Sequence, residues 1–516
     1  MLVLVLVLQT PLTRPSTSIQ ASNQYEDQQP ATSNPRLCCW MSVPEPNPLQ
    51  LSPDAMRAFG HRVVDIIVDH IESLRDRTVS VQVPRTQLDA RIGAFSDAPA
   101  SPDDVLSIVE RDVMGAITAV DHPRFYAFVP GPGSFVGAMA DALSSGFNVF
   151  AGHWLAASGP GAVELQTIEL LRQACGFPPG AGGLFVSGGS MANLSGLATA
   201  RAVKLGGPDP KAVIYLSDQA HSSVAKGLRV LGFASSQVRS VPVDEKLRMD
   251  TRALHKAVVE DGQSGKRPFC VVASAGTTNT GAVDPLEDIA ALCQANDMWL
   301  HVDGAYGAAA ALTERGRSVM RGLHLADSIA LDPHKWLFQP FEIGCVLVRD
   351  MGYLRQAFAV HPEDNASYLA DVGRMAEREV VFYEHGVQLT RSFRALKLWM
   401  SLRVFGLAAF RHAIDRGIAL AEEVEHKLRA DSRWEVVTPA QLAVVTFAPP
   451  LQGRSVAECN ALVERAVERL TADGYAMVTS TQVRGRSVLR FCLIHPDAQM
   501  EEVRETADRL ARYCAE

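Results

Sequence analysis

Two residues with complementary chemistry, a lysine and an aspartate, each follow an apolar run in this sequence. Lys335 lies in ADSIALDPHKWLF, and Asp303 ends the apolar stretch in WLHVDGAYG. A single lysine is usually a surface or salt-bridged residue, but a lysine and a carboxylate at the ends of buried strands can converge on one ligand. Pyridoxal phosphate (PLP) needs such a pair, because a lysine holds its aldehyde as a Schiff base and a carboxylate keeps its pyridine nitrogen protonated. The pair therefore predicts a PLP site.

Polar residues also follow three other apolar runs. FVSGGSMANLSGL passes from a strand through two glycines and Ser190 into a predicted helix, whose free N–H groups could hold a phosphate. His221 in SDQAHSS follows AVIYL, where an imidazole could stack on a flat ring. Thr277 and Thr278 follow FCVVA and offer hydroxyls. Open α/β sheets bind ligands at the carboxyl ends of their strands, so five such ends favour one cofactor site.

Composition excludes several classes of function. The 516 residues, 47% of them hydrophobic, can bury a large core and suggest two or three domains. A net charge of −8 provides no basic field for nucleic acid or anionic lipid, so a small-molecule substrate is favoured. The nine cysteines are scattered, without a CxxC motif or His-rich ligand spacing. This pattern predicts no metal site, no disulfide framework and a cytoplasmic location.

The N-terminus is unusual. MLVLVLVL supplies eight apolar residues with no basic residue before them, and a polar segment rich in Pro, Ser, Thr and Gln follows. This is too short for a membrane span and has the wrong flanks for a signal peptide, although a cleaved export signal stays open. We expect no membrane association, and we expect residues 1–48 to be disordered or a mis-assigned extension.

Three structured regions are expected after this extension. Residues 49–134 should form a helical segment, with one helix capped by Ser52 and a second helix over 102–120. Isolated, such amphipathic helices would expose an apolar face, which favours a homodimer. Residues 135–392 alternate strands and helices and predict a large domain with a mostly parallel sheet. Residues 393–516 show long helical patterns and two short strands, AVVTFAP and VLRFCLI, which predict a small α+β domain.

These blocks, in this order, resemble the group II PLP-dependent amino-acid decarboxylases, and most closely their aromatic-L-amino-acid decarboxylase branch. The resemblance runs from about Leu51 to Tyr513 and is carried by HPRFYAFVPGPGS, the Gly188–Ser190 turn, SDQAHSS, GTTNTG, HVDGAYG, DPHKW and RSFRALKLWMSLRVFG. It implies an α/β architecture, the fold-type-I PLP-dependent transferase fold, with a mostly parallel seven-stranded sheet. It also implies a homodimer with active sites at the subunit interface, and a reaction that converts an L-amino acid to its amine and CO₂.

The resemblance assigns roles to individual residues. Lys335 would bind the cofactor, and Asp303 would keep the pyridine nitrogen protonated. His221 would stack on one face of the ring, and Ala305 would pack against the other. The remaining cofactor contacts that it implies are Gly189, Ser190, Thr278 and His334.

A tyrosine after the last strand of the large domain is the expected proton donor. The segment 357–389 is polar, has no clear apolar period at its start, and is interpreted as a mobile lid. The family carries a catalytic tyrosine on this lid, and Tyr368 in SYLAD matches it; Tyr383 is the rival, and a packed aromatic is the third interpretation. Aldehyde-forming relatives have phenylalanine there, so a tyrosine favours plain decarboxylation.

The substrate is predicted from the blocks that line the family's side-chain pocket. Phe125, Phe128, Gly131 and Trp154 fall in these blocks and would accept a flat aromatic side chain, as in tyrosine, DOPA, tryptophan or phenylalanine. Ordinary core packing is the alternative interpretation of each.

Other activities stay open at this point. Arg124 and His153 could meet an acidic side chain, as in relatives acting on glutamate or cysteine sulfinate, and 2,4-diaminobutyrate is a further candidate. An aminotransferase would need a cation that clamps the α-carboxylate, for which Arg490 is suitably late in the chain. An aldehyde synthase and a catalytically silent scaffold complete the alternatives.

Overall fold

The computed structural model describes residues 47–360 and 379–516. The chain divides into two compact units, Met1–Ala58 and Phe59–Glu516. The first described helix, α1 (Pro53–Ser73), has the cap that its sequence predicts, because the N–H of Ala55 donates to the hydroxyl of Ser52 at 3.3 Å. Most of the N-terminal extension and Tyr368 lie outside the described residues, so the predictions made for them stay predictions.

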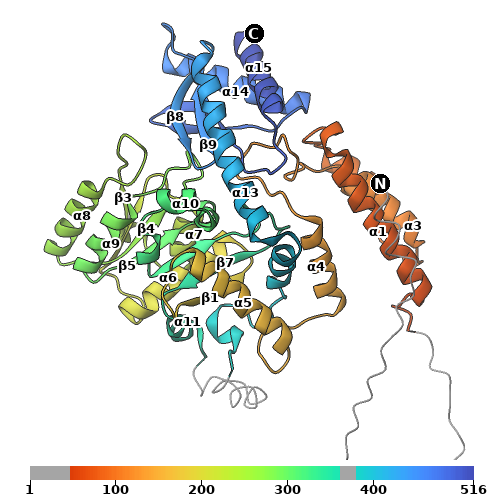
Figure 1. Cartoon of the computed structure of the whole chain (residues 1–516), viewed down its shortest axis with the longest axis horizontal. Coiled ribbons are helices and arrows are strands. Elements are labelled where there is room, and N and C mark those ends of the chain that lie inside the picture. Colours follow the sequence, from red (N-terminus) through yellow and green to blue (C-terminus); the bar gives the residue numbers. More distant parts are fainter. Residues whose placement is uncertain (1–46, 361–378) are drawn as a thin grey trace, which may run out of the picture. The chain divides into compact units, whose positions relative to one another are not determined.

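The large sheet confirms the predicted fold class. In the described residues its seven strands are β1 (Gly182–Val186), β2 (Ala212–Ser217), β3 (Val238–Val241), β4 (Arg267–Ser274), β5 (Trp299–Asp303), β6 (Ser328–Leu331) and β7 (Gly344–Val348). Their order is β1-β7-β6-β5-β4-β2-β3, and β7 alone runs antiparallel to its neighbours. The carboxyl ends of the parallel strands therefore meet at one edge (Figure 1).

Helices cover both faces of this sheet because its strands are apolar on both sides. One face packs against α6 (Gly189–Leu205), α7 (Ser222–Val230) and α11 (Met351–Phe358), and the other against α5 (Ser158–Ala174), α8 (Thr251–Gln263) and α9 (Leu286–Ala295). In β5, Leu300 and Val302 join the core on the α9 side. The alternation of the strand turns the other three residues, Trp299, His301 and Asp303, toward α6.

A second sheet belongs to the C-terminal region. Its order is β10-β11-β9-β8, all antiparallel, with β8 (Glu435–Gln441), β9 (Val444–Ala448), β10 (Thr479–Val483) and β11 (Arg486–Cys492). Two of these strands match the predicted pair, and β8 and β10 were missed. The helices α14 (Val456–Asp473) and α15 (Met500–Ala515) pack beside it.

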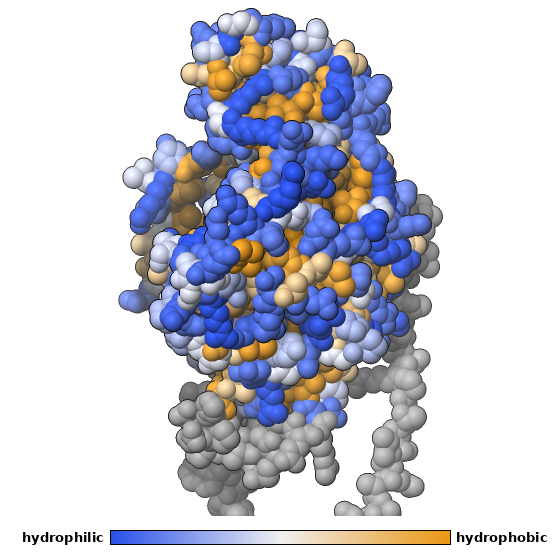
Figure 2. Space-filling view, turned by 90° about the vertical axis from the view of Figure 1, so that its left-hand side faces the viewer, coloured by the Kyte–Doolittle hydropathy of each residue, from blue (hydrophilic) through white to orange (hydrophobic). Residues whose placement is uncertain are grey.

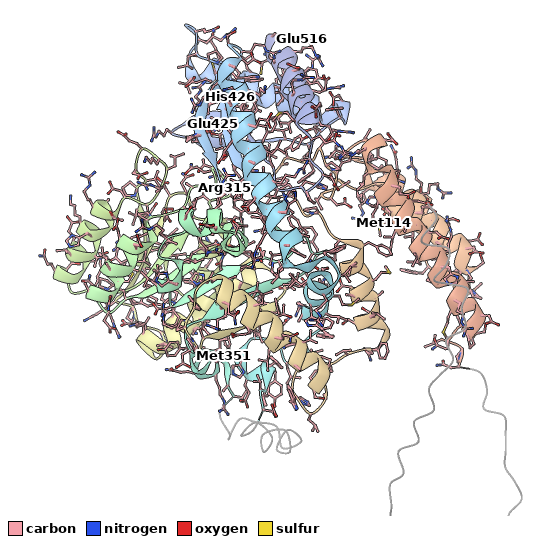
Figure 3. All side chains as sticks on the ribbon, viewed as in Figure 1. Met114, Arg315, Met351, Glu425, His426 and Glu516 are labelled. Atoms are coloured by element: carbon pink, nitrogen blue, oxygen red, sulfur yellow. The ribbon has the colours of Figure 1, made fainter. Side chains whose placement is uncertain are left out.

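The long helix α13 (Ala395–Ala430) connects the two sheets. Gly406, at φ 75°, interrupts its helical backbone between the two helical patterns that the sequence shows. Farther along, Arg315 of α10 (Glu314–Val319) lies beside α13 and forms an ion pair with Glu422 (Figure 3). Glu425 accepts a hydrogen bond from the N–H of Ala440 in β8 at 2.7 Å. The helix α13 therefore contacts α10, next to the large sheet, and β8 of the second sheet.

One predicted helix is shorter than expected. The helix proposed for residues 102–120 is α3 (Pro102–Ile108) followed by a π-helical turn over Val109–Val113. Gly115 follows, and a Cβ there would lie 2.2 Å from the carbonyl oxygen of Arg111, so the chain turns back too closely for a side chain. Among the described residues, the other helical elements are α2 (Arg85–Ile92), α4 (Phe135–Gly146) and the short turns Leu74–Asp76, Ser235–Gln237, Gly307–Leu312, Leu323–Leu325 and Phe382–His385.

No helix among the described residues is both long enough and apolar enough to cross a membrane. The face drawn in Figure 2 is predominantly hydrophilic, with apolar side chains in smaller patches.

Candidate active site

A cavity of about 350 Å³ opens at the carboxyl edge of the large sheet, next to the ends of β1, β2, β4, β5 and β6. Its lining includes all eight residues that the sequence assigned to the cofactor: Gly189, Ser190, His221, Thr278, Asp303, Ala305, His334 and Lys335. Residues separated by more than a hundred positions in the chain thus surround one space.

The amine of Lys335 is held by a carboxylate from its own turn. Its Nζ lies 3.0 Å from Oδ2 of Asp332, a residue that is only 2% exposed. The other oxygen of Asp332 has no hydrogen-bond partner among the described residues. Burial lowers the pKa of His334, although Asp332 acts in the opposite direction. The turn after β6 therefore presents a lysine amine that is paired inside the cavity.

Asp303 is anchored on both of its carboxylate oxygens. Oδ2 accepts a hydrogen bond from Nδ2 of Asn193 at 3.0 Å, and Oδ1 accepts one from the N–H of Ala305 at 3.2 Å. The residue is 8% exposed and lines the cavity. These two bonds fix the direction in which the carboxylate faces a ligand.

His221 is held at the start of α7. It is the N-cap residue of this helix, and its Nδ1 accepts a hydrogen bond from the N–H of Ser223 at 3.2 Å. The hydroxyl of Ser223 lies 2.8 Å from the same nitrogen. Since Nδ1 is engaged with Ser223, Nε2 is the ring nitrogen left to interact with a ligand.

The turn from β1 into α6 is suited to a phosphate. Its N-cap residue, Gly188, gives no side-chain cap to the 17-residue helix, so the first N–H groups of α6 are available at the cavity. A Cβ at Gly189 would lie 2.7 Å from Oδ2 of Asp332 and 3.0 Å from Cβ of Ala305, so glycine keeps this space open. An amine, an anchored carboxylate and an uncapped helix start are the three groups that PLP requires, and the cavity fits this cofactor.

Six further polar residues line the cavity that sequence reasoning did not single out: Ser187, Asn193, Ser223, Ser274, Tyr306 and Asp332. Two of them carried a signal. Asn193 lies three positions after Ser190 in a predicted helix, and Asp332 lies three positions before Lys335, so each shares a face or a turn with a predicted site residue.

The predicted substrate-pocket residues are not part of this lining. Phe125 is 1% exposed and packs with Val79 and Ala127, whereas Phe128 is 58% exposed with φ +45°. A Cβ at Gly131 would meet the ring of Phe341 at 2.8 Å. Trp154 lies beside Gly161, whose Cβ would be 3.1 Å from the indole. In the single chain, core packing is therefore the better description of Phe125, and the other three lie outside the cavity lining.

The cations considered for acidic substrates or an α-carboxylate have protein partners. Arg124 donates to the carbonyl oxygens of Tyr475 at 2.7 Å and Arg77 at 3.3 Å, so its guanidinium binds backbone. His153 accepts from the N–H of Ala156 at 3.2 Å. Arg490 donates from Nη1 to the carbonyl oxygen of Phe128.

Tyr383, the alternative proton donor, lies in a buried position beside His153. Tyr383 is 8% exposed, and its ring makes an edge contact with His153 at 6.2 Å between centroids. Within the described ranges, no group of three or more His, Cys, Asp or Glu side chains is arranged to hold a metal ion.

Comparison with known proteins adds the family. The pyridoxal-dependent decarboxylase conserved domain matches residues 85–449. Aromatic-L-amino-acid decarboxylase of Bacillus atrophaeus is 48% identical over 457 residues, which cover 88% of this chain and 94% of that protein. The crystal structure of Oryza sativa TDC with PLP and tryptamine has a TM-score of 0.84 at 28% identity and covers 91% of this chain and 99% of its own. Rhodiola rosea 4-hydroxyphenylacetaldehyde synthase has a TM-score of 0.82 at 26% identity, with the same coverage. The chain therefore belongs to the pyridoxal-dependent decarboxylase family and is a PLP-dependent amino-acid decarboxylase.

Proposed function

We propose that this enzyme decarboxylates an aromatic L-amino acid to the corresponding amine. The observation that carries the proposal is the single cavity in which Lys335, Asp303 and the uncapped start of α6 meet. The similarity to an aromatic-L-amino-acid decarboxylase at 48% identity supports the choice of substrate class.

Each of the eight predicted cofactor residues has a proposed task. When bound, PLP supplies an aromatic ring that accepts the electron pair released with CO₂. Lys335 binds the cofactor aldehyde, and Asp303 holds a proton at the pyridine nitrogen. His221 and Ala305 contact opposite faces of the ring. The proposed phosphate and remaining cofactor contacts are Gly189, Ser190, Thr278 and His334.

A proton must return to the substrate's α-carbon after CO₂ leaves. We assign this step to Tyr368, a proposal that rests on its sequence match because the residue lies outside the described ranges. Tyr383 is the alternative donor and is held in the buried turn Phe382–His385. A phenol suits the step because it can give a proton to a carbanion within hydrogen-bond reach.

Release of CO₂ from each of the twenty amino acids tests the substrate class. We expect tyrosine, DOPA, tryptophan or phenylalanine to give the highest kcat/KM, with one equivalent of amine for each CO₂. A glutamate, cysteine sulfinate or 2,4-diaminobutyrate preference would overturn the aromatic assignment. The backbone contacts of Arg124 count against an acidic substrate, since its guanidinium is already occupied.

Aldehyde synthesis is the second candidate, because the Rhodiola rosea relative is an aldehyde synthase. This reaction consumes O₂ and yields peroxide, so an oxygen electrode separates the two activities on the same substrate. Oxygen uptake equal to CO₂ release would replace the decarboxylase proposal by the aldehyde synthase.

We further propose a homodimer, located in the cytoplasm, whose active sites lie at the subunit interface. Support comes from large apolar side chains that the single chain leaves in water: Phe147, the C-cap residue of α4, is 80% exposed, and Val404 is 60% exposed on the adjoining α13. Phe128 is also exposed, so a second subunit could bring this ring toward a cavity. Light scattering of the purified protein should give twice the 55.8 kDa of one chain, and a monomer would contradict the proposal.

A further inference from the structure

A buried row of polar residues runs behind the cavity on the α6 side of the sheet. Trp299, His301 and Asp303 alternate along β5, and Ser328 of β6 lies directly opposite His301 in the strand register. Asn193 comes from α6 above them. Trp299 and Asn193 are 1% exposed, and His301 and Ser328 are fully buried, so each polar atom needs a protein partner.

The groups at the two ends of this row, the Trp299 indole and the Asp303 carboxylate, together set the direction of its hydrogen bonds. The indole Nε1–H of Trp299 donates to the hydroxyl oxygen of Ser328 at 2.8 Å, and an indole can only donate. The hydroxyl proton of Ser328 is then free to go to Nδ1 of His301 at 2.7 Å. His301 is left with its proton on Nε2, from which it donates to Oδ1 of Asn193 at 2.9 Å. Burial lowers the pKa of His301, which agrees with a neutral ring.

At the amide of Asn193, this chain of hydrogen bonds divides into two branches. With Oδ1 occupied, its Nδ2 donates to Oδ2 of Asp303 at 3.0 Å and to the hydroxyl of Ser223 at 3.1 Å. Ser223 then donates to Nδ1 of His221 at 2.8 Å, which leaves the His221 proton on Nε2. A flipped amide would instead place Oδ1 against the carboxylate of Asp303, and that contact is repulsive. With the amide in the observed orientation, Oδ1 faces His301 and can only accept, so Nε2 of His301 carries the proton.

We propose that Asn193, His301 and Ser328 are positioning residues. The chain of hydrogen bonds that begins at Trp299 sets which way Asp303 faces the cofactor nitrogen. It also sets which nitrogen of His221 carries its proton. The two proposed contacts to the ring, one at its nitrogen and one at its face, are thereby coupled through one amide. This inference rests on the role proposed above for Asp303.

Gly196 shows that the row requires space as well as polarity. A Cβ at this position of α6 would lie 2.6 Å from Cε1 of His301, 2.7 Å from its Nδ1 and 3.2 Å from the hydroxyl oxygen of Ser328. Only glycine therefore lets the imidazole lie between the helix and the strands in the orientation that the chain needs.

The decisive experiment compares PLP with 1-deaza-PLP, which lacks the ring nitrogen, in binding to the full-length chain freed of cofactor. Wild type should bind PLP more tightly. Ser328→Ala should weaken PLP binding about tenfold, the lower end of the effect seen when an outer-shell partner of a metal ligand is removed. Binding of 1-deaza-PLP should weaken by only about twofold, because this analogue lacks the nitrogen that Asp303 contacts and keeps only the contact of His221 with the ring face.

The control is Thr199→Val, which removes another fully buried hydroxyl from α6; that hydroxyl donates only within the helix, to the carbonyl oxygen of Ser195 at 2.8 Å. It should leave both affinities unchanged. Equal weakening of both ligands by Ser328→Ala, no weakening of either, or the same selective loss in Thr199→Val would overturn the positioning role. Equal affinity of wild type for PLP and 1-deaza-PLP would instead overturn the contact between Asp303 and the nitrogen.

A second measurement determines which nitrogen of each histidine carries the proton, and it requires no substitution of Trp299, Ser328, His301 or Asn193. The ¹⁵N shifts of histidine-labelled wild type should show His301 and His221 protonated on Nε2 and bare on Nδ1, with the His221 signals identified by their loss in His221→Gln. A proton on Nδ1 of either ring would show that the chain does not run as proposed.

Discussion

Removing the cation of Arg391 should destabilise the large domain more than any surface substitution. This side chain and that of its partner Glu164 are each 1% exposed, with Nη2 of the arginine 2.6 Å from the carboxylate. The same guanidinium donates to the carbonyl oxygens of Ala151 at 2.8 Å and Phe185 at 3.0 Å. Glu164 also accepts from the N–H of Phe185 at 3.2 Å, so the pair fixes β1 just before the turn into α6.

The expected cost follows from these contacts. Arg391→Met keeps much of the volume but leaves the Glu164 carboxylate buried with a single N–H donor, and breaking a buried pair in this way costs about 3–5 kcal/mol. The two carbonyl oxygens lose a donor as well. Adding Glu164→Gln removes the unpaired charge while keeping an acceptor for Phe185, so the double variant should recover about 2 kcal/mol, within the range of coupling between contacting residues.

Urea unfolding at fixed cofactor and protein concentration measures both values, because bound ligand and oligomerisation shift apparent stability. The matched control is Arg355→Met. Arg355 pairs with Glu384 at 2.9 Å, but its side chain is 57% exposed, so its loss should cost about 1 kcal/mol or less. If Arg391→Met costs no more than this control, or if the double variant is no more stable than the single one, the argument from the buried pair is wrong.

Three further predictions concern the reaction. Lys335→Ala should abolish turnover and the covalent hold on the cofactor; borohydride reduction followed by peptide mapping of the wild type checks the site, and label on another lysine would contradict it. Asp303→Asn should keep some PLP but lose most of kcat, because an amide cannot hold the pyridinium proton, and a near-normal kcat would refute that role. Tyr368→Phe should divert product from amine to aldehyde, ammonia and peroxide; loss of amine only in Tyr383→Phe would move the proton donor to Tyr383.

The sequence predicted the large sheet and the location of its cavity because both leave local signals. Apolar runs marked the strands, and each was followed by a residue with chemistry, as at Lys335 and His221. Because PLP requires a lysine, a carboxylate and a phosphate-binding turn, these residues could be assigned to one site from the sequence. The family resemblance was confirmed by the domain match over residues 85–449.

Other features depend on packing that single residues do not reveal. Asn193 and Ser223 are ordinary polar residues in the sequence, and their importance appears only where α6 and α7 meet β5. The strand β8 is partly exposed and polar, so its run gave no apolar signal. Phe125 was predicted in a substrate pocket because of its block, and in the single chain it packs against Val79 and Ala127 and does not line the cavity. Composition cannot separate these two uses of an aromatic residue.

The alternation along β5 has a consequence for how this protein can change over evolution. Trp299, His301 and Asp303 face α6, whereas Leu300 and Val302 face the opposite core. Inserting or deleting one residue within this strand would rotate the following side chains to the other side of the sheet, turning the aspartate away from the cavity and an apolar residue into it. A substitution in this strand can have a small effect, but an insertion or deletion reverses the direction of every side chain that follows it. We therefore expect variation in chain length to be confined to the connecting loops, while the five residues of this strand remain fixed in number.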